Sequence, residues 1–174
     1  MVEHPLDDRL SAVAAASNVT RPPAELSEFL VRYDEAIRSM TLGLRAITLE
    51  ELAPCHEYIF EMRSKVMLLY GTTERAIADG ICSIAVFRRH VTLSFSDGTD
   101  LHDPGRLLCG SGVTMRHIRV TTPHDLTRPE LRNFLQQARV CAGLTPRRGQ
   151  TAGRVVTRAK KRSPSRARLG SLDR

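Results

Sequence analysis

The sequence of 174 residues contains no tryptophan, and aromatic residues make up only 5% of it. Apolar residues nevertheless reach 41%, so we expect a core that consists mainly of aliphatic side chains. The four cysteines are far apart, without the Cys-x-x-Cys pair typical of zinc and dithiol redox sites. No stretch approaches the roughly 18 consecutive apolar residues of a membrane-spanning helix. A P-loop and a nucleophile with its base are also missing, which favours a protein that is not an enzyme.

A secretion signal is not expected either. Such signals begin with basic residues, whereas Glu3, Asp7 and Asp8 precede the short apolar run Ala12–Ala16. We therefore expect a cytoplasmic protein with no membrane partner.

Basic residues are concentrated towards the C-terminus. The formal net charge is +7, from 26 Lys and Arg against 19 Asp and Glu. Ten of the basic residues but only one acidic residue lie from Leu144 onward, which leaves 16 basic and 18 acidic residues in positions 1–143. The segment 144–174 is also poor in apolar residues, which is typical of disorder. We expect a flexible lead over 1–23, an α/β domain over 24–143 and a disordered basic tail over 144–174.

Two regions have the periodicity of helices. Apolar residues recur at spacings of three and four over Leu26–Ile47, which predicts one helix or two helices that break near Asp34. A further apolar stripe over Leu131–Cys141 predicts another helix. Thr127 and Glu130 precede it with the spacing of a capping box, which would satisfy the first free amides of that helix.

Five shorter segments have the length and composition of strands. In the clearest of them apolar residues alternate with Thr and Ser, so one face is expected to be buried. The predicted strands are Tyr58–Met62, Lys65–Tyr70, Ile81–Phe87, Val91–Phe95 and Met115–Thr121. The order of helix, strands and helix predicts an α+β fold: a two-layer sandwich with the N- and C-terminal helices on one face of an antiparallel five-stranded sheet.

Part of the sequence resembles a known family. The signature of the YdhG-like family, a bacterial domain of unknown function, is similar to the segments His90–Leu93, Asp103–Pro104, Leu107–Leu108, Gly110–Gly112 and Met115–Ile118. The resemblance covers about residues 25–142. It implies a frataxin-like sandwich and, for some members, a role in handling intracellular iron.

The loop that precedes the last predicted strand is the first candidate site. A Gly-x-Gly turn can direct successive backbone amides at an anion, and an arginine adds positive charge. These residues lead to the hypothesis of a non-enzymatic binding module for a small anionic or metal-bearing ligand, and the alternative is a tight turn into a strand. The candidate residues are Gly110, Ser111, Gly112, Arg116 and His117.

The family resemblance suggests a second candidate, an iron chaperone. A frataxin-type site would use acidic residues of the first helix, where the sequence allows a loose surface site near Glu28 and Glu35. The alternative is that these carboxylates belong to an ordinary solvated helix face. Iron is the one cofactor that the sequence suggests.

The basic tail is the candidate for contact with nucleic acid. Lys and Arg spread along a disordered segment attract phosphates without sequence specificity. A nucleic-acid-associated accessory protein is therefore an alternative function, and a merely solubilising extension is the competing interpretation. The candidate residues are Arg147, Arg148, Arg158, Lys160, Lys161, Arg162, Arg166 and Arg168.

Overall fold

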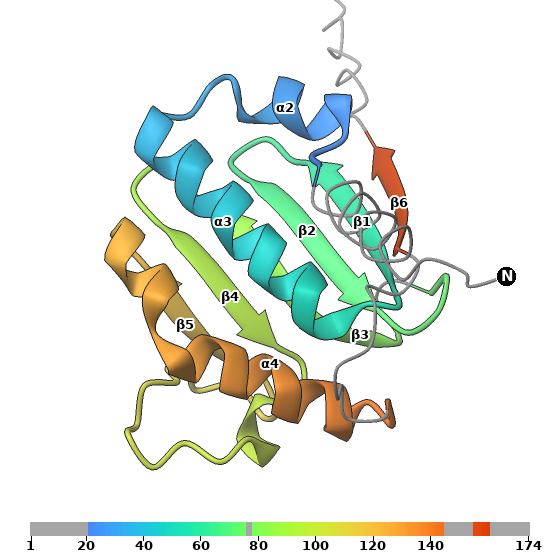
Figure 1. Ribbon diagram of the computed structural model, residues 1–174, viewed down its shortest axis with the longest axis vertical. Helices are drawn as coiled ribbons and strands as arrows, with labels where there is room; N and C mark the ends of the chain where they lie inside the picture. Colours follow the sequence, from blue (N-terminus) through green and yellow to red (C-terminus); the bar gives the residue numbers. More distant parts are fainter. Residues whose placement is uncertain (1–20, 76–77, 145–154, 161–174) are drawn as a thin grey trace, which may run out of the picture.

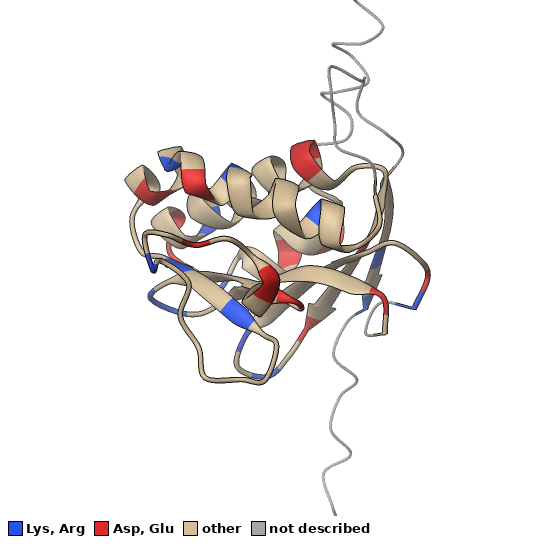
Figure 2. Ribbon diagram, turned by 90° about the horizontal axis from the view of Figure 1, so that it is seen from below, with Lys and Arg blue, Asp and Glu red and all other residues tan. Residues whose placement is uncertain are grey.

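The computed structural model describes residues 21–75, 78–144 and 155–160 and shows a two-layer α+β sandwich (Figure 1). The helices lie on one side of a single sheet (Figure 2). In chain order the elements are α2 (Ala24–Leu30), α3 (Glu35–Leu52), β1 (Cys55–Glu61), β2 (Val66–Gly71), β3 (Gly80–Val86), β4 (Val91–Phe95), the 3-10 helix η1 (Gly98–Asp100), β5 (Arg116–Val120), the 3-10 helix η2 (Pro123–Thr127), α4 (Pro129–Cys141) and β6 (Val155–Lys160).

The six described strands form a mixed sheet in the order β5-β4-β3-β2-β1-β6. Strands β1 to β5 form an antiparallel meander, as predicted. Strand β6 pairs with β1 in parallel, in a register that runs from Cys55 opposite Val155 to Phe60 opposite Lys160. The prediction of an antiparallel five-stranded sheet is therefore wrong, because a segment expected to be disordered supplies a sixth strand.

Strand β6 forms although the surrounding composition is typical of disorder. Its first three residues, Val155–Thr157, are β-branched and therefore favour an extended backbone. Without β6, strand β1 would be an edge strand with unpaired backbone groups, and the parallel ladder satisfies them. The other predicted tail residues lie outside the described part of the chain: Arg147, Arg148, Lys161, Arg162, Arg166 and Arg168.

Side-chain alternation gives the sheet two different faces. In β4, Val91, Leu93 and Phe95 are fully buried, as the sequence alternation predicts. The Phe95 ring meets Phe134 of α4 edge-on, with ring centroids 6.1 Å apart. These residues therefore belong to the side that the helices cover, which we call the helix face. The opposite side, which no described helix covers, is called the open face.

The first helical region breaks at Asp34, which is the second of the two predicted alternatives. Helix α2 ends at Leu30 and α3 begins at Glu35. Between them, the hydroxyl of Tyr33 donates a hydrogen bond of 3.2 Å to the carbonyl of Val86 in β3. The break therefore lets α2 turn and close one end of the core while remaining attached to the sheet.

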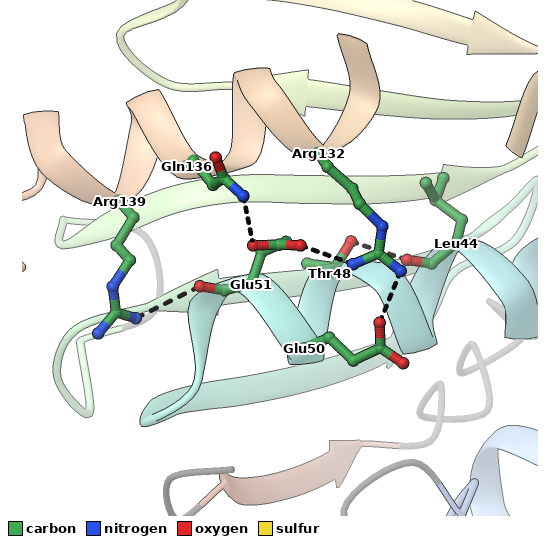
Figure 3. Close-up of polar contacts among 7 residues, drawn as sticks. All are labelled: Leu44, Thr48, Glu50, Glu51, Arg132, Gln136 and Arg139. Carbon is green, nitrogen blue, oxygen red and sulfur yellow. Dashed lines mark hydrogen bonds and ion pairs between the residues drawn. The ribbon is translucent and has the colours of Figure 1, made fainter. Parts of the chain in front are cut away.

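Polar side chains join α4 to the C-terminal end of α3 (Figure 3). Arg132 donates to Glu51 Oε1 at 2.6 Å and to Glu50 Oε2 at 2.7 Å. Arg139 is 5% exposed and donates to the carbonyl of Leu52 at 2.8 Å. A side chain of α4 thus satisfies one of the carbonyls that the end of α3 leaves without a helical partner.

The predicted capping box at Thr127 and Glu130 is wrong. The N-cap residue of α4 is Arg128, whose side chain makes no capping hydrogen bond. The capping box lies one turn earlier, between Thr122 and Asp125 at the start of η2. Thr127 is the last residue of η2, and its hydroxyl donates to the carbonyl of His124 at 2.8 Å instead of capping α4.

Asp125 holds the turn that leads into α4. Its side chain is buried, and Oδ2 accepts hydrogen bonds from the backbone amides of Thr121 at 2.8 Å and Thr122 at 2.9 Å. Arg128 lies 2.6 Å from Oδ1. Burial alone would raise the pKa of Asp125, but the hydrogen bonds and the arginine outweigh it and lower the pKa from 3.8 to about 2.

We expect Asp125→Asn to lower the free energy of unfolding by about 2 kcal/mol at pH 7. A depressed carboxyl pKa contributes stability that is complete above the unfolded-state value and is lost as the pH falls through the folded-state value. The difference from the wild-type chain should therefore shrink to about half near pH 3. Urea unfolding at both pH values measures this, with Asp100→Asn as an exposed control. A pH-independent difference would contradict the assignment.

Candidate functional site

The loop before β5 uses its polar groups to close itself. Cys109 and His117 exchange two backbone hydrogen bonds, at 2.7 and 2.8 Å. Arg116 Nη1 donates to the carbonyls of Gly112 at 2.6 Å and Met115 at 2.8 Å. The guanidinium of the predicted anion site is thus bonded to carbonyls of its own loop, as the alternative of a tight turn implies.

The charged residues predicted at this loop do not converge. Arg116 and His117 are consecutive residues of β5, so their side chains point to opposite faces of the sheet. Arg116 lies opposite Phe95 on the helix face, whereas His117 lies opposite Ser94 on the open face. Gly110, Ser111 and Gly112 are exposed in the same loop. These residues therefore belong to one segment of the chain, but the side chains of Arg116 and His117 do not line a common pocket.

The two residues of the predicted iron site lie on different helices. Glu28 is in α2 and Glu35 begins α3, on either side of the break. Glu35 forms an ion pair with Arg38 one turn later in α3. In the described ranges, no three His, Cys, Asp or Glu side chains are grouped so that they could hold a metal ion. These observations give the hypothesis of an iron site no support.

A buried polar network that is not predicted from the sequence centres on Glu57 of β1. Arg45 of α3 donates to both carboxylate oxygens at 2.8 Å, and both side chains are buried. The hydroxyl of Tyr70 donates to Oε1 at 3.1 Å, and that of Thr157 in β6 donates to Oε2 at 2.8 Å. Burial, and then the charge of Glu57, raises the pKa of Tyr70 well above its usual value, so its hydroxyl stays a donor.

The network determines which way β6 faces. Because Thr157 contacts Glu57 on the helix face, alternation directs Arg158 and Lys160 to the open face. The sequence signal for this network is an arginine beside the apolar stripe of α3 and a glutamate inside an apolar strand. The sequence alone does not show that these two residues form a pair, because Arg45 and Glu57 are in different elements.

Charge is divided between the two faces of the sheet. The described strands contain two carboxylates, Glu57 and Glu61, and both are on the helix face, where they pair with Arg45 and Arg32. Among the basic residues of these strands, Arg116 is on the helix face. The other Lys and Arg residues of the strands point to the open face: Arg119, Arg158 and Lys160.

A second basic group adjoins Arg119 at one end of the open face. His90 lies in the turn between β3 and β4, and its pKa is lowered first by burial and then by the positive charges of Arg119 and His117. Lys65 Nζ lies 5.6 Å from the centre of the Phe87 ring, and that ring stacks on His90 with centroids 4.8 Å apart. Positive charge and aromatic rings therefore meet at this end of the sheet.

Arg158 is held only weakly at the opposite edge of the open face. Its guanidinium lies 2.8 Å from Glu74 of the β2–β3 connection, and the two side chains are 53% and 67% exposed. An exposed ion pair of this kind contributes about 0–1 kcal/mol. Arg158 can therefore exchange Glu74 for another anion at little cost.

The comparisons with family models, with curated proteins and with solved structures found no match. The resemblance to the YdhG-like family, and the frataxin-like fold that it implies, therefore remain predictions. The described helices include none whose length and apolar character would suffice to cross a membrane.

We expect Thr157→Val to loosen β6 while the remaining sheet keeps its stability. Valine preserves the shape and strand preference of threonine but removes the hydroxyl that donates to Glu57, a loss of about 1 kcal/mol. Amide hydrogen exchange in residues 155–160 should become about fivefold faster. Thr92→Val, on the open face of β4, is the matched control. Unchanged exchange in β6 would show that this hydroxyl does not hold the strand.

Proposed function

We propose that this chain is a non-enzymatic nucleic-acid-binding protein, in which the open face of the sheet acts together with the basic C-terminal segment. The observation that supports the proposal most is the position of β6. It adds Arg158 and Lys160 to the face that carries Arg119 and His117, and the described strands direct no carboxylate to that face. Glu74 of the β2–β3 connection pairs weakly with Arg158, but the strands themselves present only cations on this face, and such a face attracts phosphate groups.

The spacing of the cations favours a long anion over a small one. The two edge strands, β5 and β6, are separated by five strand intervals, which amounts to about 24 Å at about 4.8 Å per interval. A small anionic ligand would reach the basic residues of one edge, whereas a nucleic-acid chain can contact both. The segment from Leu144 onward contains ten Lys and Arg residues, and Arg158 and Lys160 of β6 are two of them.

Fluorescence anisotropy with labelled oligonucleotides of mixed sequence tests the proposal on the full chain. We expect the wild-type chain to bind with an affinity that falls steeply between about 50 and 200 mM KCl. Arg119→Ala and Lys160→Ala should each weaken binding to all sequences alike. Each should also reduce the slope of log affinity against log salt by about 0.7 for every phosphate that the variant no longer neutralises.

Arg38→Ala is the matched control for these two variants. It removes the same charge from a partly exposed arginine of α3, on the other side of the molecule. The control should bind like the wild-type chain. Absence of binding by the wild-type chain at low salt would overturn the proposal, and an equal reduction in Arg38→Ala would show that net charge alone is responsible.

A further inference from the structure

Strand β1, which lies next to the basic edge strand β6, presents aromatic rings on the open face. Alternation in β1 directs His56, Tyr58 and Phe60 to this face, because the intervening Glu57 and Ile59 are buried on the helix face. The rings of His56 and Tyr58 are nearly parallel, with an interplanar angle of 12° and centroids 6.3 Å apart. Phe60 is half-buried and so presents part of its ring to the surface.

A second group of rings lies where the β3–β4 turn meets the same face. Phe87 and His90 are both half-buried and stack with an interplanar angle of 20°. Lys65 and Arg119 bring positive charge to this pair. The open face therefore combines two sets of ring surfaces with cations at both edges.

Two buried polar atoms on this face lack a partner within the described residues. They are the hydroxyl of Tyr58, whose side chain is 7% exposed, and Nδ1 of His56. A buried polar atom without a hydrogen bond costs about 1–3 kcal/mol.

We propose that the open face binds single-stranded nucleic acid by stacking unpaired bases on Phe60 and on the Phe87–His90 pair, with the phosphates on Arg119, Arg158 and Lys160. This inference rests on the proposed function and adds the form of the nucleic acid to it. Bases of a duplex have no free ring surface, whereas those of a single strand stack on aromatic side chains regardless of sequence.

The same charges argue against a second copy of the chain on this face. In a twofold dimer the same patch meets itself, so Arg119, Arg158 and Lys160 would lie against cations without a carboxylate from the described strands to balance them. The half-buried Leu69 of β2 lies between the basic edges, and its apolar surface suits the faces of bases. A single strand therefore matches both the charge and the apolar surface of the face.

The test uses the full chain and labelled oligonucleotides of about 12 nucleotides, within the range of about 4–16 for a single-strand site. DNA and RNA of the same sequence are compared with the corresponding duplexes by fluorescence anisotropy. Phe60→Leu and Phe87→Leu keep apolar volume but remove the ring, and Phe60→Trp restores one. Met67→Leu is the matched control, since Met67 lies directly opposite Phe60 in β2 and has no ring. Thermal unfolding confirms that each variant is folded.

We expect each leucine variant to bind at least one of the two single strands about 5- to 150-fold more weakly, which corresponds to about 1–3 kcal/mol for one stacked base. Phe60→Trp and Met67→Leu should bind like the wild-type chain. Duplex binding should change little in any of these variants. If the leucine variants weaken the binding of only one of the two single strands, DNA or RNA, the site is assigned to that strand.

Four results would overturn the inference, and the first of them leaves the proposed function intact. Leucine variants that bind single strands as tightly as the wild-type chain, while Arg119→Ala still binds weakly, exclude stacking but not nucleic-acid binding. A loss of affinity that appears only in the double variant Arg166→Ala/Arg168→Ala assigns binding to the C-terminal segment. If sedimentation shows a dimer that Phe60→Leu dissociates, and this variant keeps its affinity for oligonucleotides, the face is assigned to contact with a second copy of the chain. No binding to any oligonucleotide removes both proposals.

Discussion

The carboxylate of Glu57 is the constraint on which the rest of the structure depends. A buried charge is tolerated only when its partners are complete, and those of Glu57 in β1 come from three other elements: α3 through Arg45, β2 through Tyr70 and β6 through Thr157. The network ties the helix layer to the sheet and sets the side to which each residue of β6 points. The stability of the core and the charge of the outer surface therefore have the same origin.

The main elements of the fold follow from local patterns. The apolar stripe of α3 and the alternation of β4 are signals within one element, and both are borne out by the buried side chains. Strand β6 was not predictable because its pairing depends on an edge strand 100 residues earlier in the chain, from Cys55 opposite Val155. The cap before α4 was misplaced because the spacing of Thr127 and Glu130 does not show that Thr127 belongs to η2, where its hydroxyl donates to the carbonyl of His124.

The candidate site was harder to predict than the fold. Arg116 and His117 are neighbours in sequence, but an extended strand separates neighbours onto opposite faces. Arg119 and Lys160 are far apart in sequence, yet the sheet places both on the open face. The basic composition near the C-terminus did predict an affinity for polyanions, which remains a prediction. Amino-acid composition does not show which of these cations lie on the same face of the sheet as the aromatic rings.

The parallel pairing of β6 with β1 has a consequence for the order of folding. Strands β1 to β5 pair with sequence neighbours, so they can form during synthesis before residues 155–160 have left the ribosome. Until then the backbone of β1 is an unprotected edge, and this is the stage at which newly made copies are most able to pair with one another. The pairing of β6 with β1 then ends this exposure.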